Sequence, residues 1–512
     1  MLGLRFLKQL FSKYFTVALL LVLQVALICV FFYLLNVLFT PFIIIEIIIG
    51  FLVVLYIINK DEQPEFKVPW LILILTVPLF GVVCYLLFAN PKLNKKQYKR
   101  LFTIHEKTQV YVTPTEEQTQ RLKDQYPDFY GIDRYLNKSS YLSGHFDSKV
   151  TYFNCGEEFF PDLISQLDQA EKFIFMEYFI LAEGKIWDSI HEMLKQKVEQ
   201  GVEVRILYDD IGTSGLQKTE YYRTLRKEGI KCYKFHSFRP FVSGVYNYRD
   251  HRKITVIDGK VGYTGGINVG DEYANIIHKY GYWKDTAIKI EGSAVANLTA
   301  MFLQLYDLTS KETSDYSAYL DCDYQRFDDG GYVFPFGDGP KPYYEELIGE
   351  NNFINMINSA KRYVYITTPY LITDHTLTTA IKNAAYRGVD VRIVVPHIPD
   401  KKIIFNITRS KFPTLMKAGV KIYEYTPGFI HAKSVVVDDE IAFVGTINFD
   451  YRSLVHHFEC GAVMYKTPCI KDIKEDLDHT IAVSALVNKD NYKQNGFVRF
   501  INSLLAVLTP ML

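Results

Sequence analysis

Two stretches of the sequence carry the same reactive side chains at the same spacing. In both, a histidine, a lysine and an aspartate follow the pattern H-x-K-x4-D, and an asparagine stands 17 positions after the histidine (251 to 268 and 431 to 448). The residues are His251, Lys253, Asp258 and Asn268 in the first copy, and His431, Lys433, Asp438 and Asn448 in the second. A repeat of this kind points to one site built from both halves of the chain.

The residue types suit chemistry on a tetrahedral anion. Alternate side chains of a strand share a face, so we expect His251 and Lys253 on one side and Arg252 on the other. Lysine binds phosphate as a point charge, and histidine can serve as nucleophile or general acid near neutral pH. A downstream aspartate can hold an imidazole in one tautomer. Two facing copies would bring two imidazoles, two ammonium groups and two Gly-Asn turns to one phosphate.

The segments HRKITVID and HAKSVVVD, each followed by a G-[GT]-x-N turn, resemble the duplicated HKD motifs of the phospholipase D superfamily. The lead-in Asn247-Tyr248-Arg249-Asp250 is similar to that of bacterial cardiolipin synthases, and apolar segments near the N-terminus agree with that branch. The resemblance covers residues 150–512 together with the membrane anchor. It implies a membrane phosphatidyltransferase that joins two phosphatidylglycerol molecules into cardiolipin and releases glycerol.

The resemblance also implies roles for the motif residues. One histidine would form a phosphohistidine and the other would act as general acid and base, and family habit assigns these roles to His251 and His431 respectively. The phosphoryl oxygens would be held by Lys253, Lys433, Asn268 and Asn448, the motifs would be anchored by Asp258 and Asp438, and the headgroup would be contacted by Asn247 and Arg249. No metal or other cofactor is expected, because the paired lysines supply the positive charge.

Two other functions remain open on the sequence. A phosphodiester hydrolase would use the same residues with water as acceptor, and a membrane scaffold would keep the fold without turnover. The two intact His-Lys pairs argue against the scaffold. A nucleic-acid partner is not expected, because 57 basic residues balance 57 acidic ones. Seven scattered cysteines indicate a reducing compartment and no metal site. The oligomeric state stays open.

The first 90 residues predict membrane segments. Since about 20 apolar residues cross the hydrocarbon core, we expect spans at about 15–38, 41–58 and 68–88. A cleaved signal peptide is the alternative for the first span. Glu46 inside the second is either functional or paired with a neighbouring helix. The lysines and arginine that follow the last span outnumber the basic residues before the first, which favours a catalytic part on the cytoplasmic face of the cell membrane.

Alternating strand and helix patterns predict an α/β fold with two mixed-sheet halves in pseudo-twofold arrangement. The segments GVEVRIL and GVDVRIV are near copies, one in each half. We expect a connector at 91–145, the first half at 146–310, a linker at 311–339 and the second half at 340–512. The tail, residues 497–512, is expected to be the last packed helix of the second half, with an interfacial helix as the alternative.

Other polar residues are weaker candidates. Asp285 and Glu459 follow the two motif asparagines and could orient the same or the opposite imidazole, or lie on the surface. His456 and His457 lie beyond the second motif, where a histidine is more often ordinary than catalytic.

Overall fold

The computed structural model describes residues 13–34, 39–89, 95–213, 220–235, 248–328 and 330–488, and a few positions beyond these. The chain divides into two compact units. One comprises Met1–Lys92, Phe238–Asn247 and Phe500–Leu512, and the other comprises Leu93–Ser237 and Tyr248–Arg499. The second unit contains both H-x-K-x4-D motifs and is called the catalytic unit.

The N-terminal unit is formed by apolar helices. They are α2 (Lys13–Leu34), α3 (Phe39–Asn59), α4 (Pro64–Thr76) and α5 (Pro78–Phe88). Within α3, the stretch Pro41–Asn59 has a mean hydropathy of 2.8 over 19 residues and is long and apolar enough to cross a bilayer. The expected span at 68–88 is instead two short helices separated at Pro78, because proline lacks the N–H that would continue the helix.

Glu46 is paired with a neighbouring helix. The backbone N–H of Leu79, in the first turn of α5, donates to Glu46 Oε1 at 2.9 Å. The first N–H groups of a helix have no partner within the helix, so this carboxylate satisfies a donor that the break at Pro78 exposes. Of the two alternatives for Glu46, the structure thus favours helix pairing.

The described part of the C-terminal tail belongs to the N-terminal unit. The short helix η3 (Thr509–Met511) contacts α4. The expectation that the tail is the last helix of the second half is therefore wrong for these residues, which belong to the N-terminal unit.

The catalytic unit opens with three helices where a connector was expected. They are α6 (Lys95–Val112), α7 (Glu116–Gln125) and α8 (Pro127–Ser140). A capping box starts α7, since Thr115 and Gln118 each accept from the other's backbone N–H. Some apolar side chains of these helices are buried, among them Leu122 and Phe129, whereas Phe102 and Val110 of α6 are exposed. The sequence does not predict these helices, because most of their residues are polar and the apolar periodicity of each helix is weak.

The first half is built on a seven-stranded sheet. Its strands are β1 (Ser148–Phe153), β2 (Phe173–Tyr178), β3 (Glu203–Asp209), β4 (Lys231–Phe235), β5 (Lys253–Ile257), β6 (Val261–Gly265) and β8 (Ala287–Gly292). They stand in the order β1-β8-β6-β5-β2-β3-β4. The neighbours β2, β3 and β4 are parallel and the others antiparallel, so the sheet is mixed as expected.

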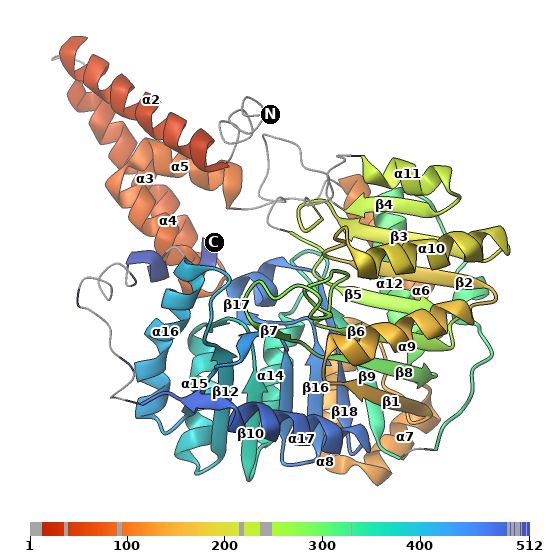
Figure 1. Cartoon of the computed structure of the whole chain (residues 1–512). Coiled ribbons are helices and arrows are strands. Elements are labelled where there is room, and N and C mark those ends of the chain that lie inside the picture. Colours follow the sequence, from red (N-terminus) through yellow and green to blue (C-terminus); the bar gives the residue numbers. More distant parts are fainter. Residues whose placement is uncertain are drawn as a thin grey trace. The chain divides into compact units, whose positions relative to one another are not determined.

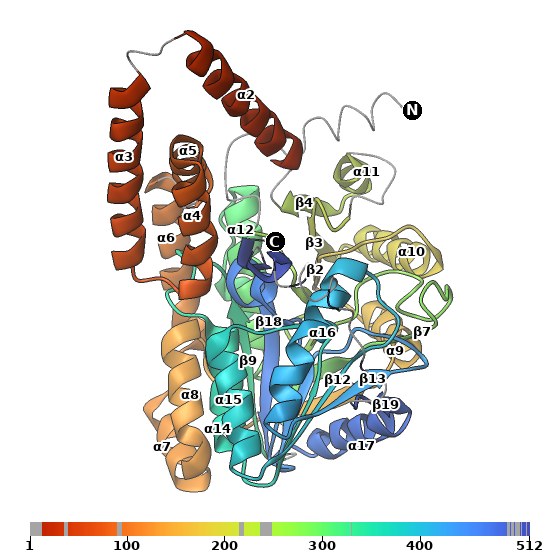
Figure 2. The same cartoon turned by 90° about the vertical axis from the view of Figure 1, so that its left-hand side faces the viewer.

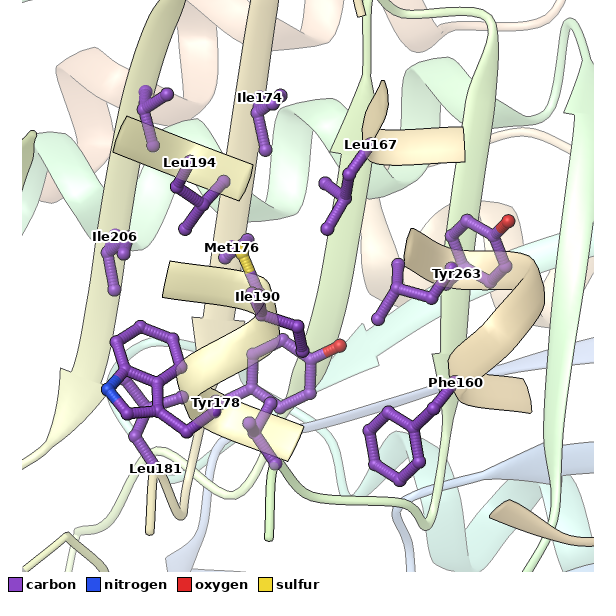
Figure 3. Packing of buried hydrophobic residues seen from close by; sticks show 14 of the residues in the cluster. Phe160, Leu167, Ile174, Met176, Tyr178, Leu181, Ile190, Leu194, Ile206 and Tyr263 are labelled. Atoms are coloured by element: carbon purple, nitrogen blue, oxygen red, sulfur yellow. The ribbon is translucent and has the colours of Figure 1, made fainter. Parts of the chain in front are cut away.

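Helices cover both faces of this sheet (Figure 1). They are α9 (Gly156–Asp168), α10 (Lys185–Glu199), α11 (Tyr221–Lys227), α12 (Val295–Ser310) and α13 (Ser317–Leu320). Figure 3 shows Ile174, Met176 and Tyr178 of β2 directed toward α9 and α10. The alternate residue Phe175 points the other way and stacks on Phe302 of α12, with ring centroids 4.6 Å apart. The period-two pattern of a strand accounts for this division.

The second half repeats the first. Its strands are β9 (Tyr332–Asp338), β10 (Tyr363–Thr367), β12 (Asp390–Pro396), β13 (Lys421–Tyr425), β15 (Ser434–Val437), β16 (Ile441–Gly445), β18 (Glu459–Tyr465) and β19 (Ser484–Leu486). Its order, β9-β18-β16-β15-β10-β12-β13-β19, matches that of the first sheet with one added edge strand. The helices are α14 (Ile348–Ser359), α15 (His375–Tyr386), α16 (Lys402–Lys417) and α17 (Cys469–Ala482), and α14 packs beside α8 (Figure 2).

The strand β9 corrects the expected linker. It occupies the place that β1 has in the first half and pairs along its whole length with β18. The last part of the segment 311–339 is thus the first strand of the second half. The segment was expected to be a linker because the glycines around it are typical of turns. Residues 332–336 nevertheless form an apolar strand that is buried throughout.

Candidate active site

Each motif histidine is held by backbone pairing to the opposite half. The N–H of His251 donates to the carbonyl of Phe458 at 2.9 Å, and the N–H of His431 donates to the carbonyl of Lys284 at 2.7 Å. The second bond extends a two-stranded pairing between β14 (Gly428–Ile430) and β7 (Tyr282–Lys284). The segment that carries each catalytic candidate therefore pairs with the backbone of the other half, and neither half can complete the site alone.

A buried carboxylate from the opposite half binds each imidazole. His251 Nδ1 lies 2.9 Å from both oxygens of Glu459, and His431 Nδ1 lies 2.6 Å from Asp285 Oδ2. Both carboxylates are fully buried. A carboxylate at Nδ1 fixes the tautomer with the proton on that nitrogen and leaves Nε2 free to accept or attack. Of the alternatives open on the sequence, orientation of the opposite imidazole is the one observed.

The turn after each motif fits its carboxylate. A Cβ atom at Gly266 would lie 2.0 Å from Asp285 Oδ1, so a side chain there would displace the carboxylate. Thr446 holds the matching position in the second copy, and its hydroxyl donates to Glu459. Ser453 also donates to Glu459. The G-[GT]-x-N turns therefore shape the carboxylate sites.

Both imidazoles are neutral near pH 7. Burial, followed by Lys253 and Lys433, holds the pKa of His251 well below its usual 6.5. Burial and Lys433 lower the pKa of His431 to about 4, while the bond to Asp285 opposes this shift. An unprotonated Nε2 is the form that attacks phosphorus.

The two motif lysines lie on the same side as the histidines and are buried. Each ammonium group donates to the carbonyl of its own motif histidine, Lys253 to His251 and Lys433 to His431. Burial lowers the pKa of Lys253 to about 8 and that of Lys433 to about 7. A bound anion would favour their charged forms again.

The motif aspartates hold backbone and do not touch the histidines. Asp258 accepts three bonds of 2.8 Å from the N–H groups of residues 171–173. Asp438 accepts three from residues 361–363, at 2.6 to 2.8 Å. Both have left-handed backbone, with φ of 54° and 55°. They tie each motif to the start of the central strand of its half, so the general idea that they orient an imidazole is wrong.

We expect Asp258→Ala to lower the melting temperature by roughly 5 °C or more, because three backbone donors lose a charged acceptor. The matched variant Asp258→Asn should lose less, since asparagine tolerates left-handed backbone and keeps one acceptor oxygen. Thermal unfolding of the purified chain in detergent measures both. Equal melting temperatures for Asp258→Ala and the unmodified chain would contradict the anchoring role.

The four predicted substrate contacts fare differently. Asn268 is engaged within the fold, since its amide oxygen accepts from the N–H of Ile180 at 3.0 Å and its nitrogen donates to the Tyr273 hydroxyl. Arg249 is buried and pairs with Asp209 at 2.6 Å, which ties β3 to the motif, and its headgroup contact stays a prediction.

The contacts predicted for Asn448 and Asn247 also stay predictions. The side-chain oxygen of Asn448 is buried and has no hydrogen-bond partner among the residues that the structure describes. It is therefore the more available of the two motif amides. Asn247 lies outside the described residues.

Two further residues adjoin the site. His457, set aside on the sequence, is buried with its ring centroid 5.5 Å from that of His251 and its Nδ1 3.7 Å from Glu459. Ligating atoms of His251, His457 and Glu459 lie within 4.8 Å of one another. Arg252 points away from the lysines as expected, but it is buried and donates to the carbonyl of Glu459 at 3.1 Å. Its loss would therefore disturb the fold.

Comparison with known proteins agrees with this geometry. The family model described as cardiolipin synthase, PLD-like domain, matches residues 163–302 and 353–481, one match in each half. A second model, phospholipase D-nuclease N-terminal, matches residues 48–90.

Curated relatives align over nearly the whole chain. A cardiolipin synthase of Staphylococcus aureus is 36% identical, covering 86% of this chain and 90% of its own. One of Alkalihalophilus pseudofirmus is 35% identical over 88% of this chain and 90% of its own. The crystal structure of phosphatidylserine synthase from Haemophilus influenzae shares the fold with a TM-score of 0.55 at 16% identity, covering 75% of this chain and 99% of its own. The chain therefore belongs to the cardiolipin synthase family of phospholipase D-like enzymes.

Proposed function

We propose that the protein condenses two phosphatidylglycerol molecules into cardiolipin and glycerol through a phosphohistidine. The observation that carries the proposal is the pair of imidazoles, each fixed at Nδ1 by a buried carboxylate of the opposite half, with two buried lysines on the same side. Two such histidines divide one displacement at phosphorus into two, with the same substrate class as donor and acceptor. The curated relatives named cardiolipin synthase support this choice of lipid.

In the first step, Nε2 of His251 attacks the phosphorus of one phosphatidylglycerol. The bound phosphodiester anion favours uptake of a proton by Nε2 of His431. As the bond from phosphorus to the glycerol oxygen breaks, His431 passes this proton to the oxygen, and glycerol leaves. In the second step, His431 takes a proton from a glycerol hydroxyl of the second lipid, whose oxygen attacks phosphorus and releases His251. Lys253, Lys433 and the amide of Asn448 stabilise the charge on the phosphoryl oxygens.

The surroundings of the histidines are compatible with this assignment of roles. An attacking imidazole must be neutral, and burial together with surrounding cations keeps the pKa of His251 well below 6.5. An acid must be able to hold a proton, and Asp285, 2.6 Å from Nδ1 of His431, favours the protonated form. Because Glu459 contacts Nδ1 of His251 in the same way, and burial lowers the pKa of both histidines, the choice between them follows the family's habit.

For the membrane topology we propose a multi-pass anchor in the cell membrane with the catalytic unit on its cytoplasmic side. Support comes from the apolar helices α2 to α5 and from the basic residues that follow them in the sequence. Such an anchor keeps the enzyme where lipid acceptors are concentrated.

The test is the product balance of the purified chain in lipid nanodiscs of labelled phosphatidylglycerol, with a chelator present. We expect one glycerol released per cardiolipin formed, without a nucleotide-activated donor. Since one phosphodiester is exchanged for another, excess glycerol should drive the reaction backward. Phosphatidic acid as the main product would favour the hydrolase, and a strict need for CDP-diacylglycerol would exclude the exchange.

A further inference from the structure

A short loop of the first half carries exposed apolar side chains in a fixed position. Ile276 and Ile277 are 41% and 52% exposed. The loop is held at its base by Asn275, whose side chain accepts from the N–H of Trp283 at 2.7 Å and donates to Glu157 at 3.0 Å. The two isoleucines are therefore presented outward by a built loop, despite the cost of leaving their side chains in water.

An aromatic wall runs from this loop to a catalytic histidine. The ring centroid of Tyr280 lies 6.4 Å from that of Trp283, and the Trp283 ring lies 5.5 Å from the imidazole of His431. Tyr273, at the start of the loop, lies 4.9 Å from Trp283 and 5.8 Å from His431. The loop that carries the exposed isoleucines is thus joined to the reacting group by a chain of aromatic contacts.

A second exposed segment of the same composition flanks the site from the other half. At the start of α16, Ile403 is 57% exposed and follows the exposed Lys401 and Lys402. Lys401 is close enough to the site to contribute, after burial and the motif lysines, to the low pKa of His251. The neighbouring carboxylate, Asp400, accepts from the Tyr370 hydroxyl at 2.6 Å and also lies 3.8 Å from Nζ of Lys401, which remains exposed.

We propose that residues 276–279 and 401–403 form an interfacial lip that enters the headgroup layer of a bilayer rich in anionic phospholipid. Each part places an exposed isoleucine near an exposed lysine, Lys279 in the loop and Lys401 directly before α16. Apolar side chains bordered by lysine are the composition of interfacial binding elements, and anionic lipid attracts lysine at the membrane surface. Tyrosine and tryptophan favour the same layer.

The lip gives the aromatic wall a function. A phospholipid drawn from the layer would keep its apolar part against Tyr280 and Trp283 while its phosphate reaches the motif lysines. The proposal rests on the proposed function in taking membrane lipid as substrate. It adds a contact that the N-terminal helices do not provide, since an anchor confines the enzyme to the membrane but does not guide a lipid to His431.

The experiment compares two forms of one substrate with the full-length chain. The double variant Ile276→Asp/Ile277→Asp is assayed on phosphatidylglycerol in vesicles and on a short-chain phosphatidylglycerol kept below its aggregation concentration. We expect roughly tenfold slower turnover on vesicles, because binding scales with the apolar area that enters the membrane, and a much smaller change on the monomeric lipid. The control is Tyr386→Asp, a 65% exposed aromatic at the end of α15, beside the opposite ends of the strands.

The outcomes separate the lip from its alternatives. Vesicle turnover equal to that of Tyr386→Asp would overturn the proposal, and so would equal losses on both forms of the lipid, which would make the loop a part of the catalytic wall only. A failure of the proposed function looks different, because the unmodified chain would then form no cardiolipin from either substrate.

Discussion

Replacing His251 by alanine is expected to lower cardiolipin formation by about 10⁴-fold or more, because the covalent route disappears with the nucleophile. His431→Ala should cost as much with phosphatidylglycerol, since an unprotonated glycerol oxygen is a poor leaving group. The two variants should differ on a lipid phosphodiester with a nitrophenol leaving group, which departs without a proton. With that substrate His431→Ala should release a burst of nitrophenol and retain the lipid on the protein, whereas His251→Ala should do neither.

The matched control is His191→Ala. His191 also pairs with a carboxylate, Glu228 at 2.7 Å, but it lies on α10 away from both motifs. His191→Ala should retain turnover. This result would show that the motif variants do not lose activity merely because a His-carboxylate pair is lost. A burst in His251→Ala and none in His431→Ala would reverse the roles. Substantial turnover by either motif variant would exclude the two-histidine mechanism.

The sequence predicted the repeated core of the fold well. The near copies GVEVRIL and GVDVRIV became β3 and β12, in matching positions of the two sheets. Periodicity succeeds there because charged and apolar residues alternate at the start of both segments, which is the period-two pattern of a strand. It failed for α6 to α8, which are polar on most of their surface, and for β9, whose partner β18 lies more than 120 residues away in the chain. Strand pairing over such a distance has no local signal.

The motif residues of the site could be predicted, but their partners could not. Glu459 stands 11 positions after Asn448 and Asp285 stands 17 after Asn268, so the two orienting carboxylates share no spacing. Both lie at the end of a segment that crosses to the other half, and that crossing is a property of the tertiary structure. The same reason explains Arg252, which faces away from the lysines as strand alternation requires yet is buried where the halves meet.

Lys253→Met and Lys433→Met are each expected to lower kcat/KM by about 10²- to 10³-fold, the cost of losing one donor to the transition state. Both ammonium groups are almost fully buried on the histidine side. Lys197→Met is the matched control. Lys197 is a buried lysine of α10, outside both motifs, and it donates to the carbonyl of Asp168 at the end of α9. Its substitution should lower the stability of the fold and leave the turnover of the folded enzyme unchanged.

The same lysines should give the reaction a dependence on pH. Burial lowers the pKa of Lys433 to about 7 and that of Lys253 to about 8, so the free enzyme loses these charges as the pH rises through that range. An anionic phosphodiester binds the charged form, and kcat/KM, which reports the free enzyme, should therefore fall above about pH 8. Bound substrate raises both pKa values, so kcat should fall at higher pH than kcat/KM. If kcat/KM stayed flat from pH 7 to 10 while both methionine variants were inactive, the lysines would act by shaping the site, and their charge would not be what the phosphate requires.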